Sequence, residues 1–256
     1  MDLKNITAEK ERINTELNIA TNIQKSILPK EFLTSQGNGK FDISATSYPA
    51  KEVGGDFYDF FFIDDDHVAI VIGGDVSGKG IPAALFMMLA KTLIKKEALY
   101  ESNPKNIFKN VNNQLARDNS ENMFVTAWMG ILEIKTAMLT YVNAGHNPPL
   151  LKTSSRYKPL KSKPNFVLGP IDDIDYIQNE IKLEKGARIF LYTDGITEAI
   201  NSKKEFFGEK NLINILNNSD LPIRDLLVKI KEECDEFSKN LEQFDDITML
   251  ILEYKI

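Results

Sequence analysis

Apolar residues recur with two different periods along this chain. Residues 3–28 contain no Gly or Pro, and their apolar side chains recur at spacings of three, four and seven, which predicts one long helix. Pro29 ends it, because the residue before a proline avoids helical dihedral angles. Short runs rich in β-branched and aromatic residues then predict strands. The expected strands are residues 41–48, 57–63, 68–73, 123–134, 137–143, 149–152, 187–193 and 247–253.

Further helices are expected between these strands, and prolines in the first turn open two of them. Strands come in consecutive pairs, and helices come in pairs between them. This order predicts an α+β fold in which helix layers cover antiparallel sheets. Residues 1–30 would form an N-terminal helix and residues 31–256 one larger domain. The additional helices are expected at residues 82–100, 104–117, 209–217 and 223–240.

Composition narrows the function classes. The chain has 256 residues, of which 43% are hydrophobic, enough for a full core. A formal net charge of -6 argues against a nucleic-acid partner. A single cysteine, Cys234, excludes an intrachain disulfide and fits a reducing compartment. No run approaches the roughly 20 apolar residues that a membrane helix needs. We therefore expect a cytoplasmic protein with no membrane insertion.

Several catalytic chemistries are disfavoured. The two histidines, His67 and His146, form no metal-ligand pair at helical spacing, so a histidine-based zinc site is not expected. Cys234 lies inside a charged helical run, where a packing role is more typical than nucleophilic attack. No Gly-x-Ser-x-Gly motif occurs.

Aspartates instead follow or precede apolar strands in four loops. They are Asp56 after two glycines, Asp75 in Gly-Asp-Val-Ser-Gly-Lys-Gly, Asp194 before a glycine, and the pair Asp245–Asp246. A single Asp-Gly usually marks a turn, but turn chemistry does not require an aspartate in every loop. Sets of carboxylate oxygens suit hard cations such as Mg²⁺ or Mn²⁺.

Six blocks of the sequence, in order, resemble the bacterial PPM-type metal-dependent Ser/Thr protein phosphatases, in their SpoIIE/RsbU-like branch. The resemblance covers the chain from about residue 17 to its end. The blocks are IATNIQKSILP (19–29), EVGGDFYD (52–59), GDVSGKGIPAA (74–84), NAGHNPP (143–149), YTDGITEA (192–199) and FDDIT (244–248).

This resemblance implies two stacked antiparallel β-sheets flanked by helix layers, with residues 31–256 as the catalytic domain. It also implies a centre of two Mn²⁺ or Mg²⁺ ions. Asp75 would bridge both ions, with Asp56 and the Val76 carbonyl on one side and Asp194 and Asp245 on the other. Asp56, Asp75, Asp194 and Asp245 are thus the expected catalytic residues, and Asp246 is a less suited sixth metal-binding position.

The same resemblance implies that a water bridging the two ions hydrolyses phosphoserine or phosphothreonine on a regulatory protein, such as an antagonist of an anti-sigma factor. The N-terminal helix carries Ile6, Ile13, Ala20 and Ile27 every seven residues, with Leu17 between them. This seam predicts a weak homodimer through that helix.

Two alternatives stay open. Gly73 through Lys79 matches most of a nucleotide-binding P-loop between a strand and a helix, although Gly80 replaces the expected Ser or Thr. The second alternative is a catalytically dead binding module of the same fold.

Overall fold

The computed structural model describes residues 3–29, 39–153, 156–239 and 241–256. It contains two five-stranded sheets, and every strand pairing within them is antiparallel. The first sheet has the order β1-β10-β9-β6-β7 and the second β2-β3-β4-β5-β8. The strands are β1 (Phe41–Tyr48), β2 (Phe57–Phe62), β3 (His67–Gly74), β4 (Thr126–Glu133), β5 (Met138–Ala144), β6 (Leu150–Lys152), β7 (Tyr157–Pro159), β8 (Asn179–Lys182), β9 (Arg188–Tyr192) and β10 (Ile247–Tyr254).

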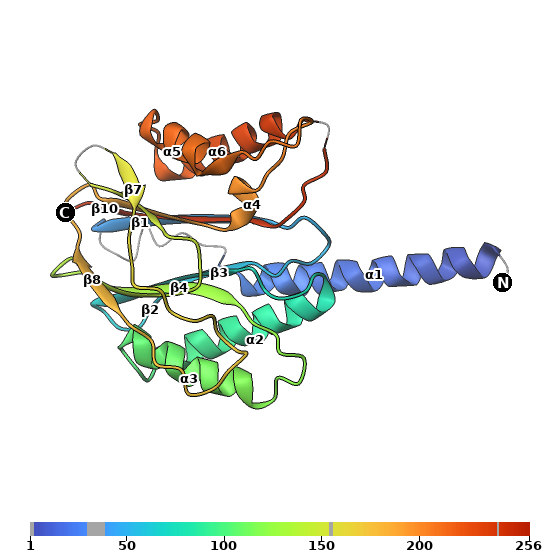
Figure 1. Ribbon diagram of the computed structural model, residues 1–256, viewed down its shortest axis with the longest axis horizontal. Coiled ribbons are helices and arrows are strands. Elements are labelled where there is room, and N and C mark those ends of the chain that lie inside the picture. Colours follow the sequence, from blue (N-terminus) through green and yellow to red (C-terminus); the bar gives the residue numbers. More distant parts are fainter. Residues whose placement is uncertain (1–2, 30–38, 154–155, 240) are drawn as a thin grey trace.

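Helices cover the outer face of each sheet, so the domain has four layers (Figure 1). One pair packs on the first sheet, another pair packs on the second, and the N-terminal helix extends away from the domain (Figure 1). The helices are α1 (Leu3–Ile27), α2 (Ile81–Ala98), α3 (Pro104–Arg117), α4 (Asp194–Thr197), α5 (Gly208–Asn217) and α6 (Ile223–Phe237). No described helix is both long and apolar enough to cross a bilayer.

Three apolar clusters hold these layers together. Alternate residues of a strand face opposite sides of its sheet, and β2 shows the result. Tyr58 and Phe60 pack in the cluster between the two sheets, whereas Phe57 and Phe61 pack beneath α2 and α3. Both faces of the central strands are therefore buried, which explains their nearly continuous apolar sequences.

The sequence-based expectations for the main elements are confirmed, although the ends of most of them are shifted by one to three residues. The antiparallel sandwich and the N-terminal helix are both present. The short elements β7, β8 and α4 were not expected. The expected boundary between residues 30 and 31 lies outside the described residues.

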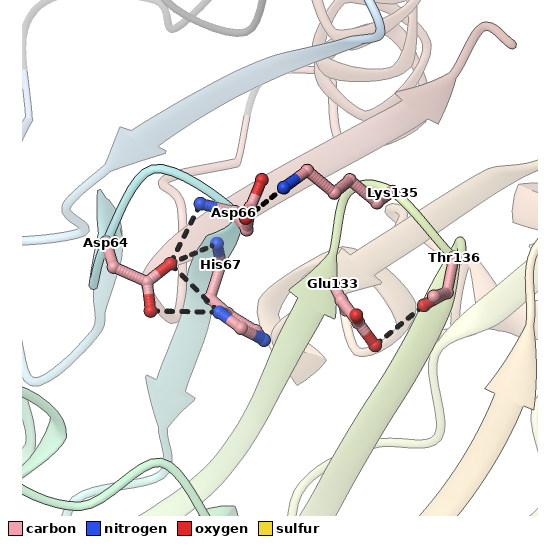
Figure 2. A network of polar contacts seen from close by, with 6 residues as sticks. All are labelled: Asp64, Asp66, His67, Glu133, Lys135 and Thr136. Atoms are coloured by element: carbon pink, nitrogen blue, oxygen red, sulfur yellow. Dashed lines mark hydrogen bonds and ion pairs between the residues drawn. The ribbon is translucent and has the colours of Figure 1, made fainter.

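A polar network closes the turn between β2 and β3 (Figure 2). The Asp64 carboxylate accepts hydrogen bonds from the backbone N–H groups of Asp66 and His67, and its oxygens lie 2.9 Å from the His67 ring. These contacts, led by the Asp66 N–H, lower the pKa of Asp64. Lys135, in the neighbouring β4–β5 turn, pairs with Asp66 at 2.6 Å.

One buried ion pair joins α2 to the second sheet. Lys91 Nζ on α2 lies 2.5 Å from Asp59 Oδ2 on β2, and both side chains are less than a tenth exposed. Burial lowers the pKa of Lys91, and the charge of Asp59 partly opposes that shift. Removing one partner of such a pair leaves a buried charge without compensation, which is far costlier than losing a surface pair.

We therefore expect Lys91→Met to lower the free energy of unfolding by about 3 kcal/mol. Lys95→Met is the matched control, because Lys95 lies 3.8 Å from the same carboxylate but is 48% exposed. It should cost less than about 1 kcal/mol. Denaturant unfolding of both variants measures the difference, and equal losses would contradict the role given to the buried pair.

Candidate active site

The four acidic loops meet at one end of the sandwich. Two antiparallel strands of each sheet bring them there: β3 ends where β2 begins, and β9 ends where β10 begins. Asp56 directly precedes β2, and Asp75 follows β3. Asp194 follows β9 by two residues, and Asp246 directly precedes β10. All six expected site residues line one cavity: Asp56, Asp75, Val76, Asp194, Asp245 and Asp246.

Asp56 is a buried carboxylate of the site. It is 8% exposed, and burial, followed by the charge of Asp246, raises its pKa well above the usual value. Hydrogen bonds from the Thr193 and Thr248 side chains oppose this shift in part. Its Oδ2 has no hydrogen-bond partner among the described residues. A buried carboxylate oxygen in this state is suited to accept a cation.

Asp194 also has a raised pKa. Burial, and then the charges of Glu198, Asp245 and Asp75, raise its pKa to about 6. The Asp194 carboxyl thus keeps its proton to a higher pH in the folded chain than in the unfolded chain. Without a bound cation, Asp194 therefore stabilises the fold at low pH, and this contribution is lost as the pH rises from about 4 toward 6. Below about pH 6, a cation that binds Asp194 must displace that proton.

Asp246 holds the backbone of the site. Its Oδ1 accepts a hydrogen bond from Ala50 N at 2.8 Å, and its Oδ2 accepts one from Gly55 N at 2.7 Å. A Cβ atom at Gly54 would lie only 2.3 Å from Asp246 Oδ2, and one at Gly195 only 2.0 Å from the Asp246 carbonyl oxygen. The two glycines therefore allow the loops to close around this residue. Both carboxylate oxygens of Asp246 are used in positioning neighbouring loops.

Asp75 is exposed and has a φ of 48°, a left-handed conformation that is uncommon outside glycine. A row of hydrogen bonds supports the preceding peptide. Thr126 Oγ1 donates to the Gly74 carbonyl at 2.7 Å, and His146 Nδ1 lies 3.2 Å from the same hydroxyl. The Asn143 side chain binds both the N–H and the carbonyl of His146.

His146 is a buried, neutral part of this support. Burial lowers its pKa to about 4, so the imidazole carries no charge at pH 7. It lines a small cavity together with Asp75 and Asp194. The Gly145–Asn147 part of the NAGHNPP block therefore lines the same small cavity as two of the carboxylates.

Two polar residues contact the acidic loops in a way that the sequence did not predict. Gln24, near the end of α1, is 5% exposed and exchanges two hydrogen bonds with the backbone of Gly54, at 2.6 and 3.0 Å. Lys79 forms an ion pair with Asp245 Oδ2 at 3.3 Å. In the sequence, Gln24 stands out only as part of the IATNIQKSILP block, and no local pattern indicates its contact with Gly54.

The donor set fits a hard divalent cation. Every acidic side chain that lines the cavity is an aspartate, two of them have raised pKa values, and Asp56 Oδ2 is unpartnered. As the described side chains lie, no three acidic, histidine or cysteine residues already form a metal-binding cluster. The carboxylates surround the cavity, and a cation would relieve their mutual repulsion.

Comparison with known proteins identifies the family. A family model described as Stage II sporulation protein E (SpoIIE) matches residues 64–255. The chain belongs to the SpoIIE family. Its expected assignment to the SpoIIE/RsbU-like branch of PPM-type phosphatases is thus confirmed, and the matched region includes all the candidate site residues except Asp56.

Relatives of this SpoIIE-family chain are longer. It is 31% identical to Protein IcfG of Synechocystis over 92% of this chain and 41% of that protein. It is 30% identical to the phosphoserine phosphatase RsbU of Bacillus subtilis over 96% of this chain and 72% of RsbU. The chain therefore spans less than half of IcfG.

Solved structures show the same fold. The SiaA PP2C domain of Pseudomonas aeruginosa aligns with a TM-score of 0.84 and 24% identity, covering 97% of this chain and 99% of that domain. The PP2C phosphatase domain of Bacillus subtilis SpoIIE, with a fragment of its regulatory domain, aligns with a TM-score of 0.71 and 18% identity. That alignment covers 82% of this chain and 63% of the SpoIIE chain.

The different contacts of the two adjacent aspartates yield a test. Asp246→Asn replaces one of two accepting oxygens with an amide nitrogen, so one backbone N–H loses its partner. We expect it to lower the free energy of unfolding by about 2 kcal/mol. Asp245→Asn should change stability by less than about 1 kcal/mol, because its pair with Lys79 is exposed, but it should weaken Mn²⁺ binding more. Denaturant unfolding and calorimetric Mn²⁺ titration measure both effects. Equal stability losses would contradict the structural role of Asp246.

Proposed function

We propose that this chain is a divalent-cation-dependent phosphatase that hydrolyses phosphoserine or phosphothreonine on a regulatory protein. The observation that carries the proposal is the convergence of Asp56, Asp75, Asp194 and Asp245 on one cavity in a member of the SpoIIE family. Four carboxylates brought together from both sheets are costly to fold unless a cation offsets their charge.

The proposed ligands follow the expected order. Asp75 is assigned to both of two Mn²⁺ or Mg²⁺ ions, Asp56 and the Val76 carbonyl to one, and Asp194 and Asp245 to the other. When bound, such ions acidify a water and neutralise phosphoryl oxygens. Asp246 is assigned to positioning, because both its oxygens bind backbone N–H groups.

The chain's own side chains favour direct attack by water. No Ser, Thr, Cys or His is among the described residues that line the cavity. Cys234 is buried in α6, and burial raises the pKa of its thiol to about 12, so it is a thiol and not a nucleophilic thiolate at neutral pH. A phosphorylated serine, cysteine or histidine intermediate therefore has no support here.

The proposed substrate is a small phosphorylated regulator, such as an antagonist of an anti-sigma factor. Two relatives, RsbU and RsbP of Bacillus subtilis, carry the name phosphoserine phosphatase.

The nucleotide-hydrolysing alternative loses its structural basis, because β3 lies in an antiparallel sheet and not in a parallel strand–helix unit. The presence of every expected aspartate in one cavity disfavours a dead binding module.

We expect hydrolysis of p-nitrophenyl phosphate and of a phosphoserine protein to require Mn²⁺ or Mg²⁺. Chelation should abolish it, and added cation should restore it. Asp75→Asn should abolish turnover, because its carboxylate is assigned to both ions. Phosphate release is the measurement, with circular dichroism as the control for folding. Full activity after exhaustive dialysis against EDTA would refute the proposal.

We further propose that α1 pairs with its copy in a second subunit. Ile13 on the outer part of α1 is 46% exposed, whereas Ile27 packs against the core beneath α2 and α3. Leu17 is partly buried, and Gln24 fixes the inner end of the helix to Gly54. The outer part thus presents apolar surface that a second helix can cover.

This pairing predicts a weak, concentration-dependent dimer. Ile13→Glu combined with Leu17→Glu should shift the sedimentation coefficient to that of a monomer at every concentration, because charge would occupy the seam. Glu9→Gln, on an exposed position of the same helix, is the control. A wild-type chain that stays monomeric up to high micromolar concentration would exclude this interface.

A further inference from the structure

One lysine crosses the mouth of the acidic cavity. Lys79 belongs to the loop between β3 and α2, yet its Nζ lies 3.3 Å from Asp245 Oδ2 and 4.3 Å from the centre of the Phe244 ring, both in the loop before β10. Phe244 is 66% exposed, and the Lys79 side chain is 52% exposed. This contact therefore joins two of the four site loops at the surface.

The ion pair occupies an oxygen that the proposed function needs. Asp245 Oδ1 accepts a hydrogen bond from the Asp246 N–H at 2.9 Å, and Lys79 takes Oδ2. A cation that binds Asp245 thus competes with Lys79 for Oδ2. Both side chains are partly exposed to solvent, and an exposed ion pair is weak. A divalent ion can therefore displace Lys79 from Asp245.

The substrate creates a need for a positive side chain. A phosphomonoester dianion must enter a cavity lined by five aspartates, and the only cationic side chains among the described lining residues are Lys51 and Lys79. A lysine freed from Asp245 gains charge-assisted hydrogen bonds when it contacts a phosphoryl oxygen. The face of Phe244 holds the ammonium group near the mouth, since a cation is attracted to an aromatic face.

We propose that Lys79 is a phosphate-binding residue that Asp245 holds at the cavity mouth until a divalent cation takes over Asp245. The inference rests on the proposed function and assigns its substrate phosphate a protein ligand. Cation loading and phosphate recognition are thereby coupled through one side chain.

The first arm of the test uses Mn²⁺ alone. Calorimetric titration of Lys79→Met should show binding about two- to fivefold tighter than that of the wild-type chain, because a competitor for Asp245 is gone. Lys51→Met is the matched control: it removes the same charge from the same cavity, and the described residues give Lys51 no ion-pair partner. Its effect on Mn²⁺ affinity should be smaller. An equal gain in Mn²⁺ affinity in both variants would mean that only the net charge of the cavity matters, and it would overturn the proposed competition.

The second arm uses inorganic phosphate with the Mn²⁺-loaded protein. The dissociation constant for phosphate should rise about tenfold or more in Lys79→Met. In Lys79→Arg it should return close to the wild-type value. Phe244→Leu should raise it about two- to fivefold. Unchanged phosphate affinity in Lys79→Met would overturn the proposal. A chain that binds Mn²⁺ and phosphate as expected but hydrolyses no phosphoester would instead refute the proposed function.

Discussion

Repulsion between aspartates at one end of the sandwich is the constraint on which the rest of this structure depends. Like charges at short distance in a partly buried setting disfavour each other's ionised form. Burial, and then the charges of neighbouring carboxylates, raise the pKa values of both Asp56 and Asp194. The fold tolerates it because both sheets, with their packed cores, impose the positions of the loops.

Much of the surrounding polar chemistry serves to hold these loops. Asp246 binds the backbone before β2, Thr126 binds the Gly74 carbonyl, and Gln24 reaches from α1 to Gly54. Both carboxylate oxygens of Asp246 and the side-chain donors of Thr126 and Gln24 are thereby engaged with the backbone. The site is thus divided between carboxylates that remain available and polar groups that fix the backbone.

The sequence predicted the long elements well because each contains several periods of its pattern. The strand at 41–48 and the helix at 104–117 have the ends expected of them. β7 and β8 are edge strands of three and four residues, too short for alternation to show, and Pro159 in β7 further masks it. The acidic loops were visible as motifs, but the contacts of Gln24 and Lys79 were not. Those contacts join segments about 30 and 166 residues apart, and local patterns carry no information on such pairings.

The two halves of the acidic cavity belong to different sheets, and this has a mechanical consequence. Asp56 and Asp75 are carried by β2 and β3, whereas Asp194 and Asp245 are carried by β9 and β10. A small sliding of one sheet over the other would change the spacing between the halves without breaking a single strand pairing. The apolar layer between the sheets, which includes Phe41, Trp128 and Leu250, resists that shear. Its close packing therefore sets the distance between the two pairs of aspartates. A substitution that changes side-chain volume deep in that layer will change this distance.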